Sequence, residues 1–335
     1  MKMDEPQVSH TEEPLVSVIV PIHNAAEYLG GALESLRSQS YARFEAILIN
    51  DGSTDDSPAI CHRFSVADKR FRILNQPNLG VSAARNAGID AAAGKWIAFL
   101  DADDLLYPES LRPMLKAAAR NDASIVAANY TTGSRISEPK GSGGIELLAA
   151  DEAIRIGLYQ KRILNNPWGM LFDVRLFRGD NAPRFRPGRY EDLDIFYRLF
   201  EHAGQIALLD RTVYFYRDNP TSFINTWSES RLDALDVTDR IVSHYEERLS
   251  QQPSDASRAL LDAALDRRFS AHYNILLLML RNRSIPPGQR GRCLEVIRRQ
   301  RLRELTNPNV RLKNKIGALL SYGGLPVLKL MAALR

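Results

Sequence analysis

The chain has 335 residues, of which 44% are hydrophobic and 25% are charged, and its formal net charge at pH 7 is +4. This composition is ordinary for soluble globular proteins and leaves room for one large or two ordinary domains. The two cysteines, Cys61 and Cys293, are far apart and lack metal-ligand spacing. A disulfide framework is therefore not expected, and a reducing cytoplasm is the simplest location.

Residues 1–13 are polar and acidic, so we predict a disordered leader rather than a secretory signal. Residues 14–130 then alternate between strand and helix patterns. β-Branched and apolar runs predict five strands, over 16–20, 44–49, 71–74, 96–100 and 124–128. This alternation predicts an α/β fold with a mostly parallel sheet and helices on both faces.

Capping residues predict where the intervening helices begin and end. Ser53 or Thr54 is a candidate N-cap for the helix after the second strand. Ser82 is a candidate N-cap for the next helix, which Gly94 closes. Pro108 is typical of the start of a fourth helix.

The second half of the chain is less regular at first and then helical. A stretch rich in Gly, Ser and Thr predicts a surface loop over 131–144, and residues 145–225 mix short helices and strands. From residue 226 onward the pattern is helical, with interruptions at prolines. We expect no transmembrane helix, because the longest uncharged stretch near the end, 316–328, is short and contains Gly and Pro.

The last part of the chain is strongly basic. Residues 281–335 contain 13 Lys and Arg against 2 Asp and Glu, a balance of +11, which leaves 31 basic and 38 acidic residues and a balance of −7 elsewhere. Basic and apolar residues together suit an anionic membrane surface, so peripheral binding to the inner face of the membrane is one interpretation. The other is that the apolar residues pack on the rest of the protein and the charges are solvated.

Acidic side chains follow the fourth predicted strand, at the edge where parallel sheets bind ligands. Asp101, Asp103 and Asp104 place three carboxylates in four residues. Such charges repel unless a cation neutralises them, and Mg²⁺ and Mn²⁺ prefer carboxylate and phosphate oxygens. The motif therefore fits a metal that links the protein to a diphosphate. An acidic turn with a helix cap explains it equally well.

Two further segments follow strands. Asp51 precedes Gly52, which permits a tight turn, and its carboxylate can accept a hydrogen bond from a nucleotide base. Arg85 lies in the segment 78–88, where it can face a nucleotide phosphate or order the acidic motifs. For Asn86 and Gly88 ordinary helix packing is the simpler explanation.

Glu191 and Asp192 begin an amphipathic helix. Two acids at a helix N-terminus stabilise its dipole, and this structural role is the commoner one. The functional alternative makes one of them a general base that deprotonates an acceptor hydroxyl.

Taken together and in this order, these motifs resemble glycosyltransferase family 2, whose members have the GT-A fold. The matching segments are Ser17–Asn24, Ile49–Asp55, Asn78–Gly88, Phe99–Asp104, Trp168–Phe172, Glu191–Asp192 and Tyr214–Arg217. The resemblance implies a GT-A domain over 14–225, with a nucleotide-sugar-binding half (14–130) and an acceptor half (131–225). A helical, basic region over 226–335 follows it.

The resemblance also implies a role for particular residues. Asp192 is expected to be the catalytic base, with Glu191 beside it, and Asp103 and Asp101 are expected to bind Mn²⁺ or Mg²⁺. His23 stands where the family more often has Tyr or Phe, although it can still stack on a base. The implied contacts to the nucleotide sugar come from Pro21, His23, Asn24, Asp51, Arg85 and Asp101.

The implied activity is inverting transfer of a sugar from a nucleoside-diphosphate sugar, with uracil as the expected base. The implied acceptor is a hydroxyl of a glycan or lipid-linked molecule in cell-surface polysaccharide synthesis, and no nucleic-acid partner is expected. The Gln-x-x-Arg-Trp motif and membrane spans of processive members are not found, which indicates transfer of one or a few sugars.

Two alternatives remain open. A metal-dependent nucleotidyltransferase would carry a Gly-rich phosphate loop with Lys or Arg after the first strand, where this chain has Pro-Ile-His-Asn. A catalytically silent module that binds nucleotide sugars would not need the intact acids Asp101, Asp103 and Asp192.

Overall fold

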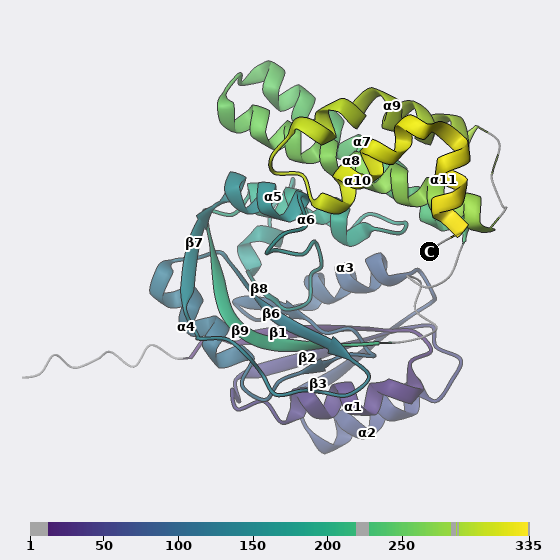
Figure 1. The fold of residues 1–335 in the computed structure, drawn as a ribbon. Coiled ribbons are helices and arrows are strands. Elements are labelled where there is room, and N and C mark those ends of the chain that lie inside the picture. Colours follow the sequence, from purple (N-terminus) through teal and green to yellow (C-terminus); the bar gives the residue numbers. More distant parts are fainter. Residues whose placement is uncertain (1–12, 219–227, 283–285, 287, 334–335) are drawn as a thin grey trace, which may run out of the picture.

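The computed structural model describes residues 13–333 except 219–227, 283–285 and 287. The predicted leader lies outside the described residues apart from Glu13, and so does the predicted boundary between residues 225 and 226. Figure 1 shows a central sheet with helices on both sides and a group of helices, coloured green to yellow, above one side.

One nine-stranded sheet forms the centre of the molecule. Its strand order is β3-β2-β1-β4-β8-β6-β9-β5, with β7 also paired to β9. The strands are β1 (Val16–Ile22), β2 (Phe44–Asp51), β3 (Phe71–Gln76), β4 (Trp96–Phe99), β5 (Leu105–Leu106), β6 (Ile125–Gly133), β7 (Ile145–Ala149), β8 (Met170–Asp173) and β9 (Gln205–Arg217).

The first four long strands run parallel, in the order β3-β2-β1-β4. Strand β8 then runs antiparallel between β4 and β6, and β6 pairs parallel with β9. The predicted α/β fold is confirmed, and the sheet becomes mixed beyond β4. The position of β8 between β4 and β6 could not be predicted, because local apolar runs do not indicate which strands pair.

Alternate residues of each strand face opposite cores, as a pleated backbone requires. Val18 and Val20 of β1 belong to a buried cluster with α1 (Ala26–Arg37), α2 (Ser57–Ala67) and α4 (Leu111–Asn121). Ile19 between them belongs to the opposite cluster, which contains α3 (Val81–Ala91), α5 (Ala150–Leu158) and α6 (Glu191–Glu201). Both faces of the sheet are therefore covered.

The C-terminal region consists of α7 (Asp233–Gln251), α8 (Asp255–Asn282), α9 (Gln289–Thr306), α10 (Leu312–Leu320) and α11 (Gly324–Ala333). Its helical character matches the sequence pattern. Val237 of α7 and Ala263 of α8 lie in the same buried cluster as Phe196 and Phe200 of α6. The helical region therefore shares a core with the sheet domain, and α7 to α11 form a further buried cluster.

Three predicted helix starts are wrong by a few residues. Helix α2 begins at Ser57 rather than after Ser53 or Thr54, because the Asp55 carboxylate accepts hydrogen bonds from the Ser57 and Ala26 N–H groups and holds a turn there. Helix α3 begins one residue before Ser82, whose hydroxyl donates to the Arg186 carbonyl instead of capping. Helix α4 begins at Leu111, after Pro108.

Candidate active site

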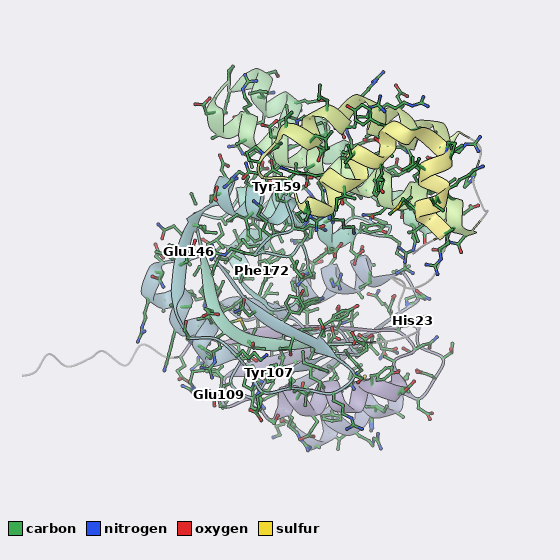
Figure 2. The ribbon with its side chains drawn as sticks, viewed as in Figure 1. His23, Tyr107, Glu109, Glu146, Tyr159 and Phe172 are labelled. Carbon is green, nitrogen blue, oxygen red and sulfur yellow. The ribbon has the colours of Figure 1, made fainter. Side chains whose placement is uncertain are left out.

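The carboxyl ends of β1, β2 and β4 meet at one edge of the sheet, and each is followed by a polar segment singled out from the sequence. Figure 2 labels His23, which follows β1, at this edge. Two groups of side chains are brought together here, one around Asp51 and one around Arg85.

Asp51 is buried at the end of β2, with 3% of its surface exposed. Its Oδ1 accepts hydrogen bonds from Gln76 Nε2 (2.7 Å) and the Leu79 N–H (2.8 Å), and its Oδ2 accepts one from the Gly80 N–H (2.9 Å). Gly52 has φ +67°, and a Cβ there would lie 2.7 Å from the Asn78 nitrogen. The carboxylate thus anchors the loop after β3, and its predicted contact with a nucleotide base remains a prediction.

The segment 21–24 packs against this group. His23 Nδ1 lies 2.8 Å from the Asp51 carbonyl oxygen, so the ring is held from the backbone while His23 itself is exposed. Asn24 has φ +49°, and its Oδ1 accepts a hydrogen bond from the Thr54 N–H (2.8 Å). Pro21, in β1, is partly exposed. These residues form one surface with the turn after β2.

The acidic segment after β4 divides into an inward and an outward part. Asp104 is 1% exposed, and its carboxylate accepts hydrogen bonds from the Tyr214 hydroxyl (2.8 Å) and the Arg217 N–H (2.8 Å). Burial, followed by the charge of Asp101, raises the pKa of Asp104 to about 8. Asp104 therefore fastens the segment to β9, while Asp101 and Asp103 stay partly exposed.

Arg85 lies buried between two acidic motifs that are far apart in the sequence. Its guanidinium donates to Asp101 Oδ1 (2.9 Å) and to Glu191 Oε1 (2.7 Å). Asp101 and Glu191 favour the charged form and raise the arginine pKa, although burial opposes this. Of the two roles that the sequence left open, this geometry fits the ordering of the acidic motifs. A contact with a nucleotide phosphate remains a prediction.

Glu191 and Asp192 form the first turn of α6, after Tyr190 with φ +61°. Glu191 is held by Arg85, whereas Asp192 Oδ1 accepts a hydrogen bond from the Leu193 N–H (2.7 Å). Among the described residues no cation forms an ion pair with Asp192. Burial, followed by the charge of Glu191, raises the pKa of Asp192 to about 6, while Arg85 and Arg267 oppose the shift. That value suits a general base near neutral pH.

Arg267 was not singled out from the sequence. It lies on α8, in the helical region, and its Nε is buried with no hydrogen-bond partner among the described residues. Burial lowers the pKa of Arg267 to about 10, and the charge of Asp192 is the largest opposing influence. No local pattern relates residue 267 to residue 192, so only the fold could reveal this neighbour.

Aromatic side chains lie next to the acidic segment. The Trp168 ring stacks on Tyr214 (centroids 4.7 Å apart, planes at 12°) and on Tyr216 (5.5 Å, 27°), and Tyr130 meets its edge at 5.0 Å. A cavity of about 560 Å³ opens beside Trp168 and Tyr130. Leu171 and Phe172 of the same sequence motif are instead buried in β8, whereas the buried Met170 lines the cavity.

The acidic segment offers oxygen ligands for a divalent metal. Within the described residues no three His, Cys, Asp or Glu side chains converge on a metal-sized position. Asp101 and Asp103 provide two partly exposed carboxylates, and Mg²⁺ and Mn²⁺ commonly use one or two carboxylates and take their other ligands from phosphates and water. The donor set thus fits a metal that binds together with a diphosphate.

Comparison with known sequences points to one family. The sequence profile described as Glycosyl transferase family 2 matches residues 17–176. Glycosyltransferase GlyG of Streptococcus pneumoniae is 31% identical over 225 residues, which make up 63% of this chain and 73% of GlyG. Glycosyltransferase GlyA of the same species is 31% identical over 231 residues, which make up 66% of this chain. The match spans only 33% of the length of GlyA.

Solved structures share the fold over nearly the whole chain. TarS of S. aureus, residues 1–349 in complex with UDP-GlcNAc, superposes with a TM-score of 0.67 at 18% identity and covers 95% of this chain and 88% of that one. The mannosyltransferase PcManGT from Pyrobaculum calidifontis, in complex with GDP-Man and Mn²⁺, superposes with a TM-score of 0.52 at 14% identity. This superposition covers 97% of this chain and 88% of PcManGT. At these identities the likeness concerns the fold, helical region included.

Proposed function

The chain belongs to glycosyltransferase family 2, and we propose that it transfers a sugar, with inversion, from a nucleoside-diphosphate sugar to a hydroxyl of a glycan or lipid-linked acceptor. The observation that carries this proposal is the ion-pair chain Asp101–Arg85–Glu191, which joins the donor-side acids to the start of α6. It brings Asp192, an acid with a pKa of about 6, into the same site.

For the donor we propose a UDP-sugar. Support comes from the exposed His23 ring beside Asp51 and Asn24, a surface suited to a base and ribose, and from TarS, a structure of the same fold in complex with UDP-GlcNAc. Pro21, Asp101 and Arg85 complete the residues that we assign to the donor.

For the cofactor we propose Mn²⁺ or Mg²⁺, held by Asp103 and Asp101 together with the donor diphosphate. A hard cation bound by these carboxylates would neutralise the negative charge that develops on the leaving nucleoside diphosphate. Support comes from the two partly exposed carboxylates and from PcManGT, a structure of the same fold in complex with Mn²⁺.

The proposed reaction is a single displacement. The acceptor hydroxyl attacks the anomeric carbon from the face opposite the leaving group, and the bond from that carbon to the diphosphate oxygen breaks. Asp192 takes the hydroxyl proton, and configuration inverts without a covalent intermediate. Glu191 cannot serve as readily, because Arg85 holds its carboxylate at 2.7 Å.

For the acceptor we assign the cavity beside Trp168 and Tyr130. An aromatic wall with polar neighbours is a suitable surface for a sugar ring. Asn129, Asn166 and Asp210 line the same cavity. We propose that the acceptor belongs to cell-surface polysaccharide synthesis, at the cytoplasmic side.

A donor screen with metal present tests the proposal. We expect one nucleoside-diphosphate sugar to yield free nucleoside diphosphate, slowly with water and faster with acceptor glycans. Release of pyrophosphate from a nucleoside triphosphate would favour the nucleotidyltransferase alternative. Donor binding by calorimetry without any release, across the acceptors tried, would favour the silent binding module.

A further inference from the structure

The end of the helical region exposes apolar side chains to an unusual degree. Of the eleven large hydrophobic residues that are exposed among the described residues, six lie between residues 302 and 330. Five of these define what we call the apolar face: Leu312 (72% exposed), Ile316 (47%), Leu319 (61%), Tyr322 (51%) and Leu330 (61%). An exposed group of this kind marks an interaction site more often than chance.

The apolar face is fixed in its outward orientation. Leu312, Ile316 and Leu319 follow the spacing i, i+4, i+7 and so form one stripe of α10. The other side of α10 is buried: Asn314 Nδ2 donates to Asp266 Oδ1 of α8 (2.7 Å), and Gly317 lies so close to Tyr273 that a Cβ would be 2.9 Å from its ring. The helix cannot rotate its apolar stripe inward without breaking these contacts.

The segment Leu312–Ala333 is long and apolar enough to cross a membrane by length and composition, with a mean hydropathy of 1.5. Its geometry argues against crossing. Gly324 has φ +68° and separates α10, of 9 residues, from α11, of 10. Each helix is then about 15 Å long, against about 30 Å of hydrocarbon. Leu328 and Ala332 are also buried in the core of the helical region.

Positive charge surrounds the apolar face. Lys329 is exposed and Lys315 partly exposed, and the Arg301 guanidinium lies 3.8 Å from the centre of the Tyr322 ring. The only acids between residues 288 and 333 are Glu295, which pairs with Arg299, and Glu304, which is buried. An apolar stripe bordered by cations complements the surface of an anionic bilayer.

We propose that the apolar face docks on a membrane that contains anionic phospholipids, with α10 and α11 lying in the interface rather than crossing the bilayer. A second copy of the chain is a poorer occupant, because two basic surfaces repel each other. In the view that Figures 1 and 2 share, α11 and His23 both lie toward the right of the molecule.

Vesicle flotation of the full chain tests this proposal. We expect binding to vesicles of phosphatidylcholine with phosphatidylglycerol, little binding to phosphatidylcholine alone, and loss of binding as salt is raised. The variant Leu312→Ser/Ile316→Ser/Leu319→Ser should bind about a hundredfold more weakly, because apolar burial supplies the affinity. Lys315→Glu/Lys329→Glu should weaken binding to the anionic vesicles only.

The matched control replaces three exposed apolar residues elsewhere, Val66→Ser/Ile136→Ser/Leu147→Ser, and should bind as the unchanged chain does. Thermal melts and donor hydrolysis in solution confirm that each variant is folded. Equal binding by both triple variants, or no binding to anionic vesicles at all, overturns the proposal. So does a dimer in light scattering that the α10 variant alone abolishes, because the face would then be covered by a second copy.

Discussion

One positive and three negative side chains lie together in a largely buried region: Arg85, Asp101, Glu191 and Asp192. Burial raises the pKa of Asp192, so the placement of the cations around it decides how easily this acid ionises. The Arg85 guanidinium donates hydrogen bonds to Asp101 and Glu191. Asp192 experiences only the weaker charge attraction of Arg85 and Arg267. The two neighbouring acids therefore have different surroundings, and we propose that Glu191 is structural and Asp192 reactive.

The reactive acid is predicted to be Asp192. Asp192→Asn keeps the size and the hydrogen bond to the Leu193 N–H but cannot take a proton, so kcat should fall by about 10²- to 10⁴-fold with donor affinity little changed. Glu191→Gln should affect donor affinity and stability more than kcat, because it weakens the contact with Arg85. The reverse pattern in steady-state kinetics would exchange the two roles.

The pH dependence should report the same residue. Asp192 must be deprotonated to act, so kcat/KM should fall as the pH drops below about 6. Arg267→Met removes a positive charge that lowers the pKa of Asp192. The fall of kcat/KM at low pH should therefore begin at a higher pH in this variant. Arg258→Met, on the exposed side of the same helix α8, is the control and should leave the low-pH part of the kcat/KM profile unchanged. Identical profiles for both variants would exclude Arg267 as a neighbour of the base.

Metal dependence is predicted for Asp103. Asp103→Ala should abolish transfer while the melting temperature stays near that of the unchanged protein, because the side chain is partly exposed. EDTA should inhibit the unchanged protein reversibly, and added Mn²⁺ or Mg²⁺ should restore it. Full activity in EDTA would contradict both statements.

Among the elements, β9 has the largest part in shaping the site. Tyr214 and Arg217 at its end hold Asp104 through two hydrogen bonds, and the Tyr214 hydroxyl also accepts one from the Asp101 N–H (3.1 Å). The Tyr214 ring stacks on the Trp168 ring. A single strand thus positions both the acidic segment and the aromatic wall of the cavity.

Tyr214→Phe should loosen that connection. The change removes one of the two hydrogen bonds to the buried Asp104 carboxylate and the hydrogen bond that the Asp101 N–H donates to the Tyr214 hydroxyl. This loss should lower the free energy of unfolding by about 1–3 kcal/mol and raise the donor KM. Tyr130→Phe, which alters the same aromatic cluster at an exposed position, is the control. Equal urea midpoints for the two variants would show that the Tyr214 hydroxyl does not hold the segment.

Across the whole molecule, the helical region contains a buried acid pair. Glu304 of α9 lies beside Asp266 of α8, and burial together with a hydrogen bond to Asp266 raises the pKa of Glu304 from 4.5 to about 9. The folded protein therefore keeps a proton that the unfolded chain loses above pH 4.5. By linkage, the stability that this group contributes is complete below about pH 4.5 and is lost as the pH rises toward 9.

Glu304→Gln should remove this dependence, because an amide can donate to Asp266 at every pH. Relative to the unchanged protein, the variant should gain stability as the pH rises from 5 to 8 in thermal unfolding. Glu295→Gln, at an exposed site on the same helix, should show no such trend. A constant difference between variant and parent over this range would mean that Glu304 does not hold the extra proton.

The sequence predicts those parts of the molecule that local patterns determine. The strands predicted over 16–20 and 44–49, which the structure extends to Ile22 and Asp51, and the acidic segment after β4 follow from apolar runs and turn residues within a few positions. Contacts between distant residues do not follow in this way. Arg85 meets Glu191 across 106 positions, and Arg267 approaches the site from a helix whose pattern indicates only packing.

The Arg85 guanidinium joins Asp101, which we assign to the donor, to the start of α6, where we place the catalytic base for the acceptor, so in the proposed mechanism the two substrates share one electrostatic connection. Any charge that the donor complex adds at Asp101 changes the attraction that Arg85 exerts on Asp192, and so changes the proton affinity of Asp192. Thermodynamic reciprocity requires that protonation of Asp192 change the donor affinity by the same factor. Equilibrium affinity for the donor alone should therefore vary with pH near 6, before any acceptor is present.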